Sequence, residues 1–214
     1  MNTRTFSRID QFINEIDKGL KTSFGPAPRA KRPNPASDKK ENELSERDRE
    51  LAGRLMRVNH AGEICAQGLY QGQALTARLP KVREKMEQAA AEENDHIAWT
   101  ADRIKELGSH TSYLNPVWYI SSFALGALAG RAGDKWSLGF VAETEKQVVT
   151  HLTGHLDKIT PDDDKSRAIL EQMREDEGKH ATTAITAGAA SFPQPIQSLM
   201  KFTSKIFTNT TYWV

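Results

Sequence analysis

The segments Glu93-Asn94-Asp95-His96 and Glu177-Gly178-Lys179-His180 share the pattern Glu-x-x-His, and this repeat indicates the fold of the 214-residue chain. A single glutamate precedes each copy: Glu63 comes before the first, and Glu143 comes before the second. Either interval is long enough for one helix to end and an antiparallel partner to return. The two Glu-x-x-His copies are separated by nearly the same length of chain as the two single glutamates. These similar offsets indicate a duplicated pair of helices.

The spacing of the repeated pattern suits metal binding. Glutamate and histidine three residues apart project from one face of a helix and can reach the same ion. Two such pairs, with one glutamate from each of two further helices, are the ligand set of di-iron and di-manganese bundles. Four carboxylates balance two divalent ions, whereas without metal they would repel one another in a buried site. Oxygen and imidazole ligands favour iron or manganese, with zinc as an alternative. The sequence therefore predicts an all-α, four-helix bundle with a di-metal centre.

The neighbours of the single glutamates support this interpretation. One Glu-x-x-His on an exposed helix is common by chance, so each copy alone is a weak signal. Glu143, however, follows an apolar run at 138–142, and Glu63 lies among small and apolar residues at 61–66. Glutamates seldom enter such stretches without a partner. Both single glutamates are therefore predicted to face the interior.

The composition narrows the class of protein. The chain has 29 basic and 28 acidic residues and a net charge of +1, which provides no electrostatic case for nucleic-acid binding. Cys65 is the only cysteine, which excludes an intrachain disulfide and fits a reducing compartment. The N-terminal region lacks the apolar core of a secretory signal, and its acidic residues disfavour a mitochondrial presequence. We expect a protein of the cytoplasmic side of a bacterial cell.

Three regions follow from the distribution of apolar residues and prolines. Residues 1–43 contain apolar residues at helical spacing from Phe6 to Leu20, then four prolines that indicate an extended or mobile linker. Residues 44–190 contain the bundle, with helices expected at about 45–80, 81–107, 134–159 and 162–188. Residues 191–214 form an amphipathic segment that we expect to face a membrane.

Two apolar segments indicate contact with lipid or with the core. Residues 116–129 contain no charged residue, but this segment is too short to span a bilayer, which needs about 20 residues. It could form a buried crossover helix, or an element at a membrane surface or lining an apolar tunnel. Residues 196–213 alternate apolar residues with Lys201 and Lys205 and end in aromatic residues, as an interfacial helix does. A final core helix is the alternative.

Four segments, Val58-Asn59-His60-Ala61-Gly62-Glu63, Glu92-Glu93-Asn94-Asp95-His96, Val141-Ala142-Glu143-Thr144-Glu145 and Arg174-Glu175-Asp176-Glu177-Gly178-Lys179-His180, resemble the demethoxyubiquinone hydroxylase family. The resemblance runs from about residue 44 to residue 188. It is specific, because the Asn-His-Ala-Gly-Glu stretch is distinctive and the order and spacing of the four segments agree. That family consists of ferritin-like di-iron monooxygenases of ubiquinone biosynthesis that are peripheral to the inner membrane.

The resemblance implies a fold and a set of ligands. The fold would be a ferritin-like four-helix bundle with an apolar helical insertion between the second and third bundle helices and an N-terminal amphipathic helix. One iron ion would be bound by one half of the ligand set and the second ion by the other half, with Glu93 and Glu177 bridging. The two halves are Glu63, Glu93 and His96, and Glu143, Glu177 and His180.

The resemblance also implies a reaction. With O2 as co-substrate, the two iron ions would hydroxylate the ring of a demethoxyubiquinol-type isoprenoid quinol, at the cytoplasmic side of the bacterial inner membrane. Electrons would come from an external donor such as a reductase or NADH, or from the quinol itself. Other ubiquinone-biosynthesis proteins and a second copy of the chain are further candidate partners. Alternatives with the same bundle are a manganese catalase, a tRNA hydroxylase and an iron-binding or storage protein.

Four neighbours of the ligands are weaker candidates. His60, one turn before Glu63, could hydrogen-bond a ligand or substrate, or pack as a core histidine. Asp95 and Asp176 could orient an imidazole across the bundle, or lie on an exposed helix face. Tyr70 lies two turns from Glu63 and is expected to pack in the core, with an approach to the active site as the alternative.

Overall fold

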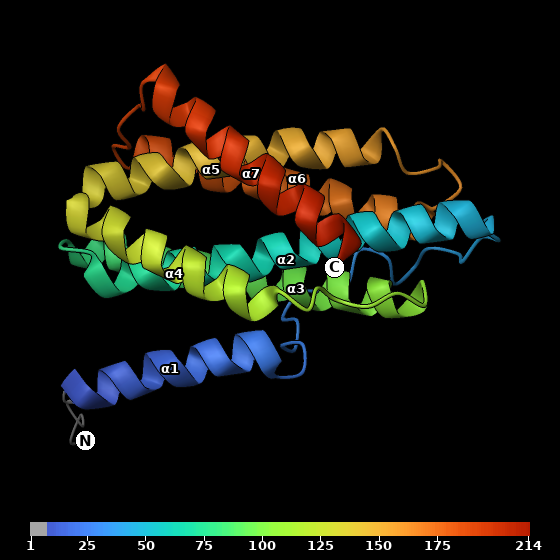
Figure 1. Cartoon of the computed structure of the whole chain (residues 1–214), viewed down its shortest axis with the longest axis horizontal. Coiled ribbons are helices and arrows are strands. Elements are labelled where there is room, and N and C mark those ends of the chain that lie inside the picture. Colours follow the sequence, from blue (N-terminus) through green and yellow to red (C-terminus); the bar gives the residue numbers. More distant parts are fainter. Residues whose placement is uncertain (1–7) are drawn as a thin grey trace.

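The computed structural model describes residues 8–214, and within that range the chain forms seven α-helices and no strand (Figure 1). The predicted all-α class is confirmed. The helices are α1 (Arg8–Phe24), α2 (Glu46–Thr76), α3 (Pro80–Glu106), α4 (Asn115–Ala132), α5 (Asp134–Leu156), α6 (Asp164–Thr186) and α7 (Gln194–Trp213).

Local sequence signals set the ends of the bundle helices. The Ser45 hydroxyl accepts a hydrogen bond from the backbone N–H of Asp48 at 3.1 Å, so it caps α2. Asp163 caps α6 in the same way through the N–H of Ser166. The chain leaves α3 through Gly108, whose φ of 69° suits glycine. α5 ends at Leu156, three residues before the expected end, because 157–159 form a turn closed by backbone bonds to His155.

Besides a small cluster of Ile64, Ile97 and Tyr119 where α2, α3 and α4 meet, the core consists of two apolar layers at different heights along the bundle. Helices α2 and α3 pack as one pair, and α5 and α6 as the other. One layer centres on Met56, Trp99 and Met173, and the other on Tyr70 and Leu138. The predicted ligands lie between these layers along every bundle helix. Apolar side chains therefore separate the polar cluster from both ends of the bundle.

Helix α4 contains the charge-free insertion and lies along α2 (Figure 1). The two helices approach closely enough to require glycine at the contact. A Cβ at Gly126 of α4 would overlap the carbonyl oxygen of Leu69, and a Cβ at Gly72 of α2 would overlap the carbonyl oxygen of Phe123. The opposite face of α4 is uncovered: Ile120 and Leu128 are 66% and 64% exposed. The insertion thus packs as a helix, as one interpretation predicts, but it is buried on one face only.

Helix α7 lies on the surface of the bundle and crosses it obliquely (Figure 1). Its end is held on α2, where the Arg54 guanidinium lies 4.3 Å from the ring centroid of Trp213. Leu199, Phe202 and Ile206 of α7 are exposed. The alternative of a final core helix is therefore wrong.

The proline-containing segment between α1 and α2 differs from the loose linker that its composition suggests. It contains a turn at 35–38, lies against the bundle and buries Ala36 and Leu44 in the core. Arg32 and Glu41 also bind side chains of the bundle helices. The predicted N-terminal helix is α1, although Phe6, from which it was expected to begin, lies outside the described residues.

Candidate metal centre

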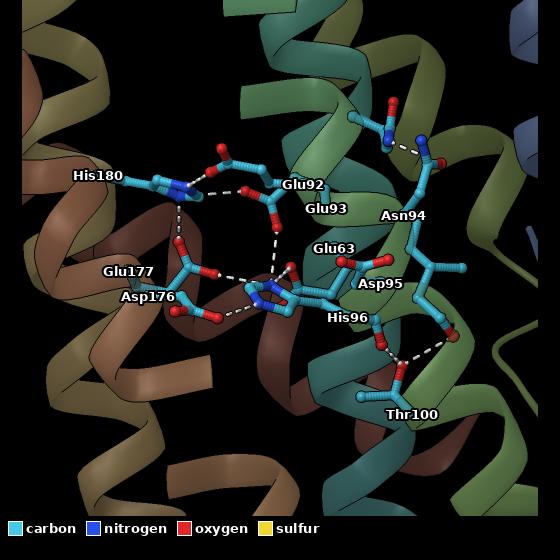
Figure 2. Close-up of polar contacts among 12 residues, drawn as sticks. Glu63, Glu92, Glu93, Asn94, Asp95, His96, Thr100, Asp176, Glu177 and His180 are labelled. Carbon is cyan, nitrogen blue, oxygen red and sulfur yellow. Dashed lines mark hydrogen bonds and ion pairs between the residues drawn. The ribbon is translucent and has the colours of Figure 1, made fainter. Parts of the chain in front are cut away.

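The bundle helices bring five of the six predicted ligands together (Figure 2). Helix α2 contributes Glu63, α3 contributes Glu93 and His96, and α6 contributes Glu177 and His180. Single ligand atoms of Glu63, Glu93, His96 and Glu177 all lie within 4.8 Å of one another. The side chain of His180 is 11% exposed and the other four are more deeply buried.

The two Glu-x-x-His glutamates lie between the two histidines. His96 Nδ1 is 3.0 Å from Glu93 Oε2 and 3.1 Å from Glu177 Oε1. His180 Nδ1 is 3.3 Å from Glu93 Oε1 and 3.0 Å from Glu177 Oε2. Each carboxylate therefore directs one oxygen to each imidazole, which is the arrangement that two bridging carboxylates between two ions require.

The structure corrects the prediction for Glu143. That side chain is only half-buried and accepts a hydrogen bond from Gln147 on its own helix at 2.9 Å. Glu145, two residues on and thus about 200° around the helix, is 2% exposed and faces the cluster. Its Oε1 accepts a hydrogen bond from the Tyr70 hydroxyl at 2.5 Å. Burial raises the pKa of Glu145 well above its usual value, and the charges of Glu177 and Glu93 add to the effect.

A sequence signal could have identified Glu145. It shares a helix face with the buried residues Leu138, Val141 and Leu152, which follow one another at helical spacing, whereas Glu143 does not. The interval from Glu145 to Glu177 also matches the interval from Glu63 to Glu93 more closely than the interval from Glu143 does.

Carboxylates outside the cluster orient both histidines (Figure 2). His96 Nε2 lies 3.2 Å from Asp176 Oδ2, and His180 Nε2 lies 2.8 Å from Glu92 Oε2. In each motif, then, the residue before the glutamate contacts the histidine of the other motif. With Nε2–H donating outward, each Nδ1 presents its lone pair to the cluster. The prediction that Asp176 orients an imidazole is confirmed, and the sequence analysis missed Glu92, which the duplication could have indicated.

Three other candidates have different partners. Asp95 does not orient an imidazole, because its carboxylate accepts hydrogen bonds from Arg32 and from the backbone of Lys31. His60 is buried, and burial lowers its pKa to about 4, as for a neutral core histidine. Tyr70 is fully buried, as predicted for a core residue, but its hydroxyl also reaches the cluster through Glu145.

The charges of the cluster favour bound protons when no metal is present. Burial and then the charge of Glu93 raise the pKa of Glu63 well above its usual value. Burial alone would lower the pKa of His96, but hydrogen bonds to Asp176, Glu177 and Glu63 raise it well above the usual value. The pKa of His180 is likewise lowered by burial but raised overall, by Glu177 and Glu93, to about 12. These protons are bound to carboxylate oxygens and imidazole nitrogens, and the same atoms are suitable ligands for two divalent ions.

The fold and the cluster define a ferritin-like, all-α protein whose bundle could hold a di-metal centre. A family model described as "Ubiquinone biosynthesis protein COQ7" matches residues 50–211. The chain is 57% identical to a protein of Nitrosococcus oceani over the whole length of both. It is 53% identical to a protein of Nitrosomonas eutropha, over 96% of this chain and 99% of that one. It is 54% identical to a protein of Acinetobacter baumannii, over 99% of this chain and all of that one.

All three relatives are named 3-demethoxyubiquinol 3-hydroxylase. The chain belongs to the COQ7 family of ubiquinone biosynthesis proteins. The family resemblance predicted from the four motif segments is therefore confirmed.

Proposed function

We propose that this chain is an O2-dependent di-iron monooxygenase that hydroxylates the ring of a demethoxyubiquinol-type precursor in ubiquinone biosynthesis. One observation carries the proposal: Glu93 and Glu177 each direct one oxygen to His96 and the other to His180. A site for one ion needs no carboxylate that is shared between two imidazoles, whereas two ions a few ångströms apart need carboxylates that reach both of them. The substrate class comes from the name of the relatives.

Each half of the cluster would hold one ion. Glu63 and His96 would bind the first, Glu145 and His180 would bind the second, and the shared carboxylates would bridge them. Two iron ions held there would supply the activation of dioxygen that ring hydroxylation needs.

The surrounding side chains hold this arrangement. Asp176 and Glu92 accept Nε2–H of the two histidines and so fix which nitrogen faces the centre. The Tyr70 hydroxyl donates to Glu145 and fixes the orientation of that carboxylate.

The balance of the reaction requires an electron donor. One oxygen atom of O2 is inserted into a ring C–H bond, and the other leaves as water with two protons and two electrons. The donor is a separate protein or NADH, or the quinol itself, since the sequence contains no nucleotide-phosphate motif.

A cavity of about 730 Å³ between α1, α2 and α3 suits the substrate ring. Tyr70 lines this cavity and contacts Glu145 at the cluster, so the cavity reaches the wall of the metal centre. The amides of Gln71 and Asn94 also line it, and their NH2 groups can donate to the oxygen substituents of a quinol ring.

We also propose a peripheral position at the cytoplasmic side of the bacterial inner membrane, and the surface of α4 and α7 supports the contact with lipid that this position requires. Large apolar side chains are exposed on both helices, among them Ile120 and Leu128 on α4 and Leu199 and Phe202 on α7. Among residues 8–214, no helix combines the length and the apolar character needed to cross a membrane. An isoprenoid quinol resides in lipid, so a surface that rests on the bilayer gives access to it. An iron-storage protein or a catalase has no need of that surface.

Extraction of quinones from a strain that lacks the gene tests the function. We expect the strain to accumulate the demethoxy precursor and the wild-type gene to restore ubiquinone. Glu177→Ala should fail to restore it, and Thr183→Ala, a change at an exposed position of the same helix, should restore it. Normal ubiquinone in the deletion strain, or full rescue by Glu177→Ala at matched protein level, would contradict the proposal.

A further inference from the structure

The segment that precedes the bundle inserts an arginine between the two helices that carry the Glu-x-x-His motifs. Arg32 Nε donates to Asp95 Oδ2 on α3 at 2.7 Å, and its Nη1 donates to Asp176 Oδ2 on α6 at 2.7 Å. The backbone N–H of Lys31 donates to the other oxygen of Asp95 at 2.6 Å. The guanidinium also lies 4.8 Å from the ring centroid of Trp99. One planar, permanently charged group thus joins α3 to α6.

This arginine reaches the predicted ligand His96 in two ways, through Asp176 and through its own Nη2, which lies 3.4 Å from His96 Nε2. Asp176 Oδ2 accepts from Arg32 and also lies 3.2 Å from His96 Nε2. Asp176 Oδ1 accepts from Gln172 at 3.1 Å. The carboxylate is held from both sides, and its orientation fixes the plane of the His96 imidazole, whose Nδ1 faces the cluster. Hydrogen bonds with a charged partner, as here, are stronger than hydrogen bonds between two neutral groups.

The other half of the centre lacks such a cation among the contacts of the described residues. Glu92 is the counterpart of Asp176, and its carboxylate contacts His180 Nε2 while accepting a hydrogen bond from the neutral amide of Gln88. The Glu92 side chain is 42% exposed, whereas that of Asp176 is 9% exposed. The duplicated motifs therefore build two halves with the same ligands but with unequal support.

We propose that Arg32 is a positioning residue for the half of the metal centre that contains His96, and that it makes the two ion positions unequal in affinity. The proposal rests on the function proposed above. Without the guanidinium, Asp176 keeps the imidazole and Gln172 as partners but loses its closest cation, the group that holds the oxygen facing His96. The His96 imidazole then loses its fixed orientation, and loss of such outer contacts typically lowers metal affinity about 10- to 100-fold.

Equilibrium binding of Mn²⁺ to the metal-free, full-length protein tests the proposal. In Arg32→Gln we expect one of the two ions to bind about 10- to 100-fold more weakly and the other to be unaffected. Arg29→Gln is the matched control, because it removes the same charge from the same segment at an exposed position, and both ions should bind as in the wild type. Arg32→Lys, which keeps the charge without the fork, should give a smaller loss than Arg32→Gln.

The same substitution in two ligand variants shows which of the two ion positions Arg32 affects. In His180→Ala, which leaves the His96 position, Arg32→Gln should weaken the remaining ion; in His96→Ala it should leave the remaining ion unchanged. A purely structural role would weaken both ions alike. Equal weakening of both ions, or no change in either while the wild type binds two, would overturn the proposal. Fewer than two ions on the wild type would instead refute the proposed function. If Arg32→Gln fails to fold, the same comparison is made with Asp95→Asn. This variant removes the charge that pairs with Arg32 on α3 and does not alter His96.

Discussion

Binding of two divalent ions to the metal-free protein at neutral pH should displace about four protons. The number corresponds to one proton each on Glu63, Glu145, His96 and His180, which puts two neutral carboxyls and two cationic imidazoles beside the two shared carboxylates and leaves the buried cluster without net charge. The raised pKa of each of these four groups acts in this direction. Metal ions take the same carboxylate oxygens and imidazole Nδ1 atoms, so each proton must leave. An exposed site of the same ligands would release at most a fraction of this number, because its carboxylates would already be ionised.

Mn²⁺ is a suitable ion for the assay because it needs no exclusion of oxygen at neutral pH. Proton release is measured with a pH indicator in weakly buffered solution, or by calorimetry in two buffers that differ in ionisation enthalpy. Glu145→Gln should lower the count by one proton per chain, whereas Glu143→Gln should leave it unchanged, since Glu143 lies off the cluster. Release of two protons or fewer by the wild type, or a loss of one proton in Glu143→Gln alone, would refute the reasoning.

The same raised pKa values set the pH dependence of the metal-free fold. Between the unfolded and the folded pKa of a group such as Glu145, the folded protein binds more protons than the unfolded chain. The free energy of unfolding therefore falls as the pH rises from about 5. Thermal unfolding of the metal-free protein should show this fall, and Glu145→Gln should reduce it. A melting temperature that rises over this range would contradict the assignment of protons to the cluster.

Three further variants test the packing, the surface and the contact to Glu145. Gly126→Leu should lower the free energy of unfolding by about 3 kcal/mol or more, because its side chain would enter the backbone of α2, whereas Gly154→Ala, with open space at its Cβ, should be neutral or stabilising in thermal unfolding. Leu128→Asp should reduce flotation with phospholipid vesicles at unchanged metal content, whereas Thr150→Asp, also exposed, should not; equal flotation of both would refute the lipid surface. Tyr70→Phe should lower turnover about tenfold with two ions still bound, as expected for a group that orients a ligand; unchanged turnover would remove that role.

The helices and most of the cluster were predictable because their signals are local. Capping residues such as Ser45 and the i, i+3 spacing of Glu93 and His96 act within one turn of helix, so the sequence displays them directly. The prediction of Glu143 as a ligand in place of Glu145 was wrong for a related reason. Glu143 directly follows an apolar run, but neighbours in sequence point to different sides of a helix, and the buried face continues to Glu145.

The role of Arg32 could not be predicted, because its contacts connect residues far apart in the chain. It lies 63 residues from Asp95 and 144 residues from Asp176, in a segment whose prolines suggest a linker. Periodicity contains no information on such contacts. The packing of α4 was partly predictable: the glycines at 126 and 130 of α4 lie against α2, those at 68 and 72 of α2 lie against α4, and such a pattern of small residues indicates a close helix pair.

A crystal structure of the Mn²⁺- or iron-loaded protein, with the ions located by their anomalous scattering, tests the central claim most directly. We predict two ions, one bonded to His96 Nδ1 and the other to His180 Nδ1, with Glu93 and Glu177 contacting both and Glu145 contacting the second. One ion alone, or a second ion bound by Glu143 instead of Glu145, would contradict the account.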